Sequence, residues 1–333
     1  MAGLYDDRLL ESLRQGASGL LGEWGLDPCS EVKLLTISEN ATFRAEEPDG
    51  RRTVVIRVHR PGYHTRQEIE SELDWIIALR REGIVDTPAP LALRNGAYLT
   101  SFQMQGEQRF VAAFAFMTGQ EPSPTDNLIG SFAQLGAISA RLHRHTRAWQ
   151  KPVTFIRKIW NFDTTVGTSP HWGDWRAAPK LTAAGTRLLE TTCLELKRQL
   201  DAYGEAPARF GLVHADLRLA NLLVEGDRLG IIDFDDCGFG WYGYDFAAAV
   251  SFFEHEPVIP ALQNAWVQGY RSVAPLDEAD VAMLPTLVML RRLLLTAWIG
   301  SHPETPAALA VADSYTEGTL HLAEDFLSRA GRR

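Results

Sequence analysis

Hydrophobic and polar residues alternate in the first third of the chain in a way that predicts a β-sheet. Residues 31–61 contain three runs rich in β-branched and apolar side chains, and polar turn formers separate them, including Pro-Asp-Gly at 48–50. Such punctuated runs are typical of strands joined by tight turns. Residues 89–119 add two or three further strands, with an Asn-Gly turn at 95–96. We therefore expect an antiparallel meander in this part of the chain.

One strong helical pattern lies between these two groups of strands. In residues 65–83, the apolar positions recur at helical spacing, and the segment ends at Gly83. This pattern predicts an amphipathic helix with a C-terminal glycine stop.

Beyond residue 119 the pattern becomes mostly helical. Residues 129–149 and 183–204 have helical spacing, and helices dominate again after the strand-rich stretch 213–236. A β-rich first third and an α-rich remainder predict an α+β fold of two lobes with a cleft between them. We expect the lobes to be residues 1–117, with an antiparallel sheet and one main helix, and residues 118–333, which are larger and mostly helical.

Composition fits an ordinary soluble globular protein, because 45% of the 333 residues are hydrophobic and 23% are charged. The first residues are acidic and do not form a secretion signal, so we expect a cytoplasmic protein. The most apolar segment, residues 284–300, is interrupted by Arg291 and Arg292. It therefore predicts a buried helix with two functional or surface arginines, and not a membrane span.

Charge and cysteine content exclude several classes of function. The net charge of -9 argues against a general nucleic-acid binder, so an anionic nucleotide would need local positive charge and a metal ion. Three widely spaced cysteines provide neither a disulfide framework nor a zinc signature.

The stretch 213–236 combines carboxylates with two of the most apolar runs in the chain. Asp216 follows His214 by two residues, Asn221 lies five residues further on, and Asp233 follows a short apolar strand. For phosphoryl transfer this set is physically sufficient. One carboxylate can orient an attacking hydroxyl and accept its proton, while an amide and a second carboxylate hold Mg²⁺ on the nucleotide phosphates. The alternative is that the carboxylates only cap turns.

The motifs HADLRLAN and IIDFDD resemble the catalytic and metal-binding loops of the aminoglycoside phosphotransferase and choline kinase group, which has a protein-kinase-like fold. The motifs SENATFR, VVIRVHRPGYH, SELDWIIAL, FMTGQEP and ARLHRHTRAW occur in the order expected for that fold. Together with HWGDWR, they make the chain similar to bacterial homoserine-kinase-like or stress-response-kinase-like phosphotransferases.

The resemblance implies a role for each residue of the catalytic stretch. Asp216 would be the catalytic base, and Asn221 and Asp233 would be the metal ligands. Arg218 stands where protein kinases usually carry lysine, so it would stabilise the transferring phosphoryl group or pair with a nearby carboxylate.

The resemblance also implies a nucleotide site in the first lobe. Arg57 replaces the usual phosphate-pairing lysine, and the family pattern favours Glu72 over Glu70 as its partner. Ser38 and Asn40 would form the turn that covers the phosphates, or they are mere turn formers. The backbone of Ala115 to Met117 would contact adenine.

The implied activity is transfer of the γ-phosphate of ATP or GTP, with Mg²⁺, to a hydroxyl of a small and amine-bearing molecule. Two alternatives remain open at this point: a protein Ser/Thr kinase of the stress-response type, and a nucleotide-binding pseudoenzyme in which Arg57 marks lost catalysis. Asp236, Asp245 and Glu254 are candidates for an acidic wall that attracts an ammonium group. Asp245 has an equal alternative role as the anchor of a helix. We expect neither nucleic-acid nor membrane partners.

Overall fold

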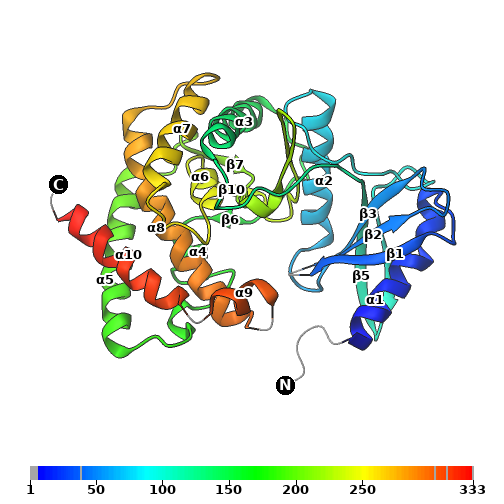
Figure 1. Cartoon of the computed structure of the whole chain (residues 1–333), viewed down its shortest axis with the longest axis horizontal. Helices are drawn as coiled ribbons and strands as arrows, with labels where there is room; N and C mark the ends of the chain where they lie inside the picture. Colours follow the sequence, from blue (N-terminus) through cyan, green and yellow to red (C-terminus); the bar gives the residue numbers. More distant parts are fainter. Residues whose placement is uncertain (1–6, 38–39, 304, 313, 332–333) are drawn as a thin grey trace. The chain divides into compact units, whose positions relative to one another are not determined.

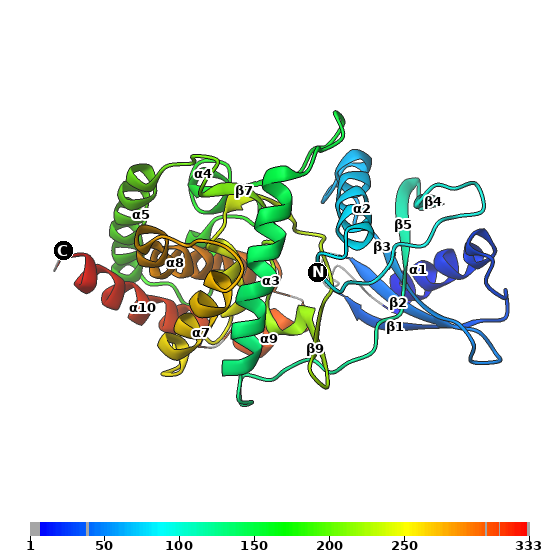
Figure 2. The same ribbon diagram turned by 90° about the horizontal axis from the view of Figure 1, so that it is seen from above.

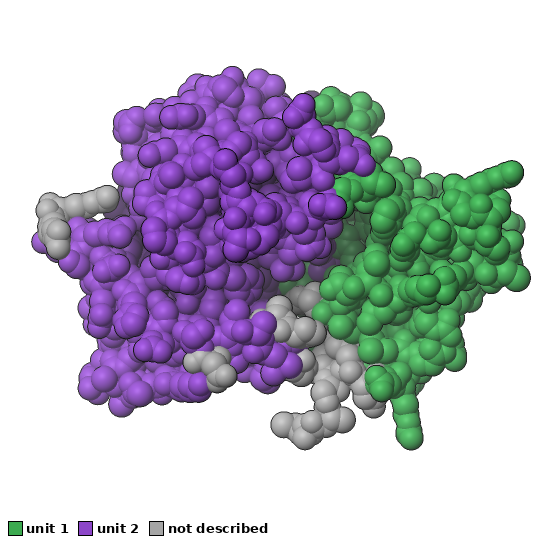
Figure 3. All heavy atoms as spheres, viewed as in Figure 1, with its two compact units in different colours: residues 1–119, 151–157 green, residues 120–150, 158–333 purple. Residues whose placement is uncertain are grey.

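The computed structural model describes residues 7–37, 40–303, 305–312 and 314–331. The chain divides into two compact units (Figure 3). Unit 1 comprises residues 1–119 and 151–157, and unit 2 comprises residues 120–150 and 158–333.

Unit 1 is built on a five-stranded antiparallel sheet with the order β1-β2-β3-β5-β4. The strands are β1 (Glu31–Ile37), β2 (Ala41–Glu46), β3 (Thr53–Val58), β4 (Leu99–Met104) and β5 (Glu107–Ala115). Alternate residues of β2 are buried, as the period of a strand requires. Helix α1 (Asp7–Gly19) packs against the sheet and contributes Leu13 to a core that includes Phe43 and Ile56 (Figure 1).

Helix α2 (Arg66–Arg81) begins at a capping box, in which Thr65 and Glu68 satisfy each other's backbone N–H groups. It is followed by Gly83, whose φ of 62° is in the left-handed region that glycine tolerates. Residues 151–157 pack along this helix, because Arg157 donates to the Glu68 carbonyl and the Ile156 N–H donates to Ser71 Oγ. The single lobe boundary predicted after residue 117 assigns residues 151–157 to the second lobe, whereas they belong to unit 1.

Unit 2 is mostly helical. Its helices are α3 (Ile129–Ala148), α4 (Phe162–Thr165), α5 (Ala183–Tyr203), α6 (Tyr244–Ala249), α7 (Ile259–Arg271), α8 (Glu278–Ser301), α9 (Pro306–Val311) and α10 (Tyr315–Ala330). Two small sheets accompany them, with the orders β6-β10-β7 and β8-β9. Their strands are β6 (Ile159–Trp160), β7 (Phe210–Val213), β8 (Leu222–Glu225), β9 (Arg228–Ile231) and β10 (Gly238–Trp241).

Two glycines allow α3 and α7 to lie side by side (Figures 1 and 2). A Cβ atom added at Gly136 of α3 would overlap the backbone of Trp266, and one added at Gly269 of α7 would overlap the backbone of Ala133. This pair of helices therefore depends on the absence of side chains at the contact.

Helix α8 is long and apolar enough to cross a membrane, but 83% of its apolar window is buried inside the protein. It contacts α5, α6 and α10 of unit 2. The expectation of a buried helix is met, and both Arg291 and Arg292 are buried, so neither is a surface residue.

The α+β class predicted from the sequence is confirmed, as are the meander and the helix after it. Two details differ. The tight turn between β4 and β5 lies at residues 105–106, and the Asn-Gly turn precedes β4. Helix α1 was not predicted.

Candidate active site

Residues 214–221 of unit 2 form the candidate catalytic loop, which connects β7 to β8. Strand β7 ends at Val213, and a short 3-10 helix, Leu219–Asn221, leads directly into β8. The turn between them includes Ala215 at a φ of 66°, a conformation that non-glycine residues seldom adopt. This turn presents Asp216, which is 8% exposed.

Asn221 is oriented by two hydrogen bonds from its amide nitrogen. Nδ2 donates to the backbone carbonyl of Asp216 at 2.8 Å and to its Oδ2 at 2.7 Å. The amide oxygen is thereby left to face another group. The backbone N–H of Ile232 donates to the backbone carbonyl of Asn221 at 2.9 Å. Asp233 follows Ile232 directly in the chain. Asp233 is exposed, with a φ of 61°. An amide oxygen and a carboxylate are ligands that Mg²⁺ prefers, so the side chains of Asn221 and Asp233 have the chemistry of divalent-cation ligands.

Arg218 pairs with a carboxylate, which is one of the two roles that its position implied. Its Nε lies 3.1 Å from Oδ2 of Asp216, and its side chain is 30% exposed. A second cation contacts this carboxylate: the sequence marked Arg291 as a functional or surface residue but did not predict its partner. Arg291 of α8 places Nη2 2.6 Å from Asp216 Oδ1, with only 2% of its side chain exposed.

Electrostatics keep the Asp216 carboxyl ionised. Burial acts to raise its pKa, but the guanidinium groups of Arg218 and Arg291 outweigh burial, and the pKa lies below its ordinary value. In contrast, burial lowers the pKa of His214, whose Nε2 faces the Ile232 carbonyl at 3.2 Å. The loop therefore presents a carboxylate beside a neutral imidazole.

Asp245 corrects the idea of an acidic wall. It is fully buried at the start of α6, where its carboxylate accepts from the backbone N–H groups of Ala215, at 2.8 Å, and His214, at 3.4 Å. The same carboxylate lies 2.9 Å from Nε2 of His143. Asp245 therefore anchors the catalytic loop to α6 and presents no oxygen to an acceptor.

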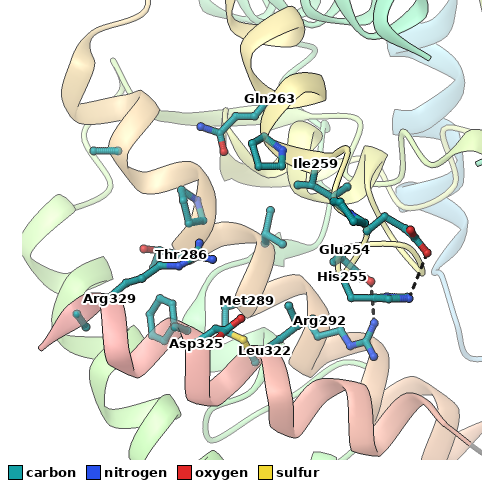
Figure 4. Close-up of a pocket in the computed structure, with 18 of the residues that line it drawn as sticks. Glu254, His255, Ile259, Gln263, Thr286, Met289, Arg292, Leu322, Asp325 and Arg329 are labelled. Atoms are coloured by element: carbon teal, nitrogen blue, oxygen red, sulfur yellow. Dashed lines mark hydrogen bonds and ion pairs between the residues drawn. The ribbon is translucent and has the colours of Figure 1, made fainter. Parts of the chain in front are cut away.

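Glu254 is a second correction. Its side chain is fully buried, Oε2 lies 2.7 Å from Arg292 Nη1, and Oε1 accepts from the Tyr315 hydroxyl at 3.3 Å. This pair lines a cavity of about 520 Å³ among α7, α8 and α10 (Figure 4). Glu254 is thus neutralised by an internal partner. Asp236 is half-buried and remains a candidate contact for the acceptor.

In unit 1, Arg57 and Glu72 form the ion pair that the sequence predicted. Nη2 of Arg57 lies 2.8 Å from Oε1 of Glu72, and Nη1 lies 3.2 Å from Oε2. The side chains are 7% and 1% exposed, and Arg57 also lies over the ring of Phe114. Glu70 instead pairs with Arg66 on the exposed face of α2. Bidentate pairing of this kind fixes the arginine in one geometry.

The remaining candidate nucleotide contacts of unit 1 are described by their hydrogen bonds with the backbone. Asn40 is buried, and its Oδ1 accepts from the N–H of Arg60, which ties the turn to the end of β3. Ser38 lies outside the described residues. The N–H of Ala115 donates to the Ala89 carbonyl, so it cannot serve adenine. Over the described part of the chain, the N–H of Met117 has no hydrogen-bond partner.

Kinases are among the known proteins that are similar to this chain. A solved structure described as a microcompartment-associated aminopropanol kinase is 44% identical, with a TM-score of 0.87 over 95% of this chain and 98% of its own. An amicoumacin kinase solved with AMP-PNP and Ca²⁺ is 21% identical, with a TM-score of 0.75 over 95% of this chain and 94% of its own, and shows the same fold. A homoserine kinase of Gluconobacter oxydans is 28% identical over 65% of this chain and 66% of its own length.

The family model matches a large continuous part of the chain. Residues 32–276 match the model described as the phosphotransferase enzyme family. This range contains Arg57 and Glu72 of unit 1 as well as Asp216, Asn221 and Asp233 of unit 2. The chain therefore belongs to the phosphotransferase enzyme family, as its catalytic and metal-binding motifs implied.

Proposed function

We propose that this phosphotransferase is an ATP-dependent and Mg²⁺-requiring kinase whose acceptor is a small amino alcohol of the aminopropanol type. The observation that carries the reaction class is the buried Asp216 carboxylate, with Asn221 hydrogen-bonded to it and Asp233 beyond the adjoining strand pair. The acceptor class is supported by 44% identity, over 95% of the chain, to a protein described as an aminopropanol kinase.

The loop geometry supports the following reaction. The acceptor hydroxyl would lie against the Asp216 carboxylate, which orients it and takes its proton. The hydroxyl oxygen then forms a bond to the γ-phosphorus, while the bond from that phosphorus to the β,γ-bridging oxygen breaks, and ADP leaves with the electron pair. Arg218 is half-buried next to Asp216, with 30% of its side chain exposed, so it can move to the transferring phosphoryl group.

Asn221 and Asp233 would hold Mg²⁺, which supplies neutralisation of the phosphate charge when bound. Arg57 would contact the α- and β-phosphates while Glu72 fixes its orientation. The N–H of Met117 would donate to adenine, and the turn containing Asn40 would cover the phosphates. ATP supplied in the cytoplasm is the proposed donor, with GTP as its alternative.

A matched acceptor panel tests the proposal. ADP release would be measured with Mg-ATP and 1-amino-2-propanol, propane-1,2-diol, homoserine, an aminoglycoside or a generic protein substrate. The first two differ mainly in the amine. We expect the highest kcat/KM for the amino alcohol. Preference for the diol would contradict an amine-bearing acceptor, and turnover of the protein alone would contradict a small-molecule acceptor.

A further inference from the structure

Two consecutive arginines of α8 are buried in unit 2, and they have different partners. Arg291 contacts the catalytic loop, whereas Arg292 contacts Glu254, Tyr315 and Thr319. A buried guanidinium is costly unless a partner compensates for lost hydration. Arg292 is explained by its role in joining α10 to α8. Arg291 differs from Arg292 in that the carboxylate it binds is the proposed base.

Two of the polar contacts of the Arg291 guanidinium reach the catalytic loop, and another reaches Ser251. Nη2 lies 2.6 Å from Asp216 Oδ1, Nη1 donates to the Ala215 carbonyl at 3.3 Å, and Nε donates to Ser251 Oγ at 3.3 Å. The ring of Trp172 lies 5.1 Å from the guanidinium carbon. Contacts on several sides leave this side chain one orientation.

These contacts complement those of Asp245. Asp245 accepts the N–H groups of His214 and Ala215, while Arg291 binds the Ala215 carbonyl and the Asp216 side chain. The peptide at Ala215, with its positive φ, is thus held from both its N–H and its C=O side. Strained backbone persists only where its surroundings fix it.

The two oxygens of Asp216 have different environments. Oδ2 accepts from Asn221 and from the half-buried Arg218. Oδ1 has one donor among the described residues, the buried Arg291. Because a carboxylate oxygen has two acceptor positions, Oδ1 retains one for a hydroxyl. By binding Oδ1, Arg291 fixes the plane of the Asp216 carboxylate and therefore the direction of this free acceptor position.

We propose that Arg291 is a positioning residue for phosphoryl transfer, which acts by holding the Asp216 carboxylate and the Ala215 peptide in the orientation that the acceptor hydroxyl requires. The inference rests on the proposed function, because it assigns Asp216 as the base. Misplacement of a reacting group by about 1 Å can cost about 10² in rate. The expected consequence of losing Arg291 is therefore a fall in kcat and not in nucleotide affinity.

A double-mutant cycle tests this coupling. Arg291→Met should lower kcat about 10²-fold with little change in the Kd for ATP, and Arg291→Lys should recover part of the loss. In an Asp216→Asn background, Arg291→Met should cost far less, because the group through which it acts is already lost. An equal cost in both backgrounds, or unchanged kcat, would overturn the inference.

Arg292→Met is the matched control, because it removes the neighbouring buried arginine of the same helix. It should lower the Tm and leave kcat near that of the parent. If Arg291→Met does not fold, the same double-mutant cycle can be measured with Arg291→Lys in its place.

Hydrogen exchange provides a readout that is independent of turnover and of the acceptor. The amides of residues 214–218 should exchange faster in Arg291→Met, or in Arg291→Lys to a smaller extent, than in Arg292→Met. Unchanged exchange there would contradict the positioning role even if the amino alcohol proves to be the wrong acceptor. Failure of the acceptor panel would instead contradict only the proposed substrate.

Discussion

Arg57 is the residue of unit 1 on which the proposed nucleotide binding depends most directly. Its two terminal nitrogens are bound to Glu72 in a buried pair on a central strand of the sheet. We expect Arg57→Ala to weaken Mg-ATP binding by about 1.5 to 3 kcal/mol, the scale of a hydrogen bond to a charged group. Arg57→Lys keeps the charge but loses the bidentate geometry, so it should recover only part of the affinity. Isothermal titration calorimetry measures both.

Loss of Arg57 also leaves Glu72 buried without its ion-pair partner, which can cost several kcal/mol of stability. Binding must therefore be compared well below each variant's Tm. Arg66→Ala is a suitable control, because it removes an exposed pair with Glu70 from the same helix. It should leave stability and ATP affinity nearly unchanged. If both Arg57 variants bind ATP like the parent, the phosphate contact lies elsewhere.

Asp233 is the residue that carries the metal prediction. In Asp233→Ala the cation would lose its main protein carboxylate, so Mg²⁺ should no longer tighten ATP binding. Titrations of ATP with Mg²⁺ and with a chelator measure this difference. Asp227→Ala, in the exposed turn of the β8–β9 hairpin that precedes Asp233, should retain the full effect of Mg²⁺. Metal-dependent binding that survives in Asp233→Ala would contradict the assignment.

The sequence predicted some of these residues because their spacing is short. Asp216 and Asn221 are five residues apart in one loop, and their contact is local. Arg291 is 75 positions from Asp216 and lies in an apolar helix, so no spacing signals it. For Asp245, the alternative role of a helix anchor was the correct one. The sequence could not show that its carboxylate is directed into the protein.

At the scale of elements, the contact between α3 and α7 is the feature most sensitive to a single methyl group. Gly136→Ala and Gly269→Ala would each insert a Cβ into facing backbone. We expect each to destabilise the protein by about 1 to 3 kcal/mol or more, as overpacking does. Urea unfolding with matched m-values measures the change.

Gly130 of α3 is the control for this prediction, because an added Cβ meets no atom there within 4 Å. Gly130→Ala should be neutral, or stabilising by up to about 1 kcal/mol through helix propensity. If Gly269→Ala were as stable as Gly130→Ala, the helices would not pack as closely as described.

The sequence predicted elements well where periodicity is strong and long. The meander and α2 have clear alternation or helical spacing, and both are present. The segment 151–157 has no regular structure, and backbone and hydroxyl contacts hold it to α2. Hydrophobic patterns do not encode such contacts. Helix α1 buries little beyond Leu13 and Ala17, so its apolar stripe is short.

At the scale of the whole molecule, net charge was a poor guide to local function. A charge of -9 is compatible with an acceptor that carries an amine. Yet Asp245 and Glu254, two of the acidic candidates of unit 2, are neutralised inside the protein by hydrogen bonds and an ion pair. Only the structure distinguishes an acidic surface from a set of internal anchors.

The most direct test of the central claim is detection of the phosphorylated product by ³¹P NMR after incubation of the full chain with Mg-ATP and 1-amino-2-propanol. We expect one phosphate monoester for each ADP formed. Asp216→Asn should reduce the rate by about 10² or more while it still binds ATP. Absence of the ester with the parent chain, or its formation at the same rate by Asp216→Asn, would contradict the account.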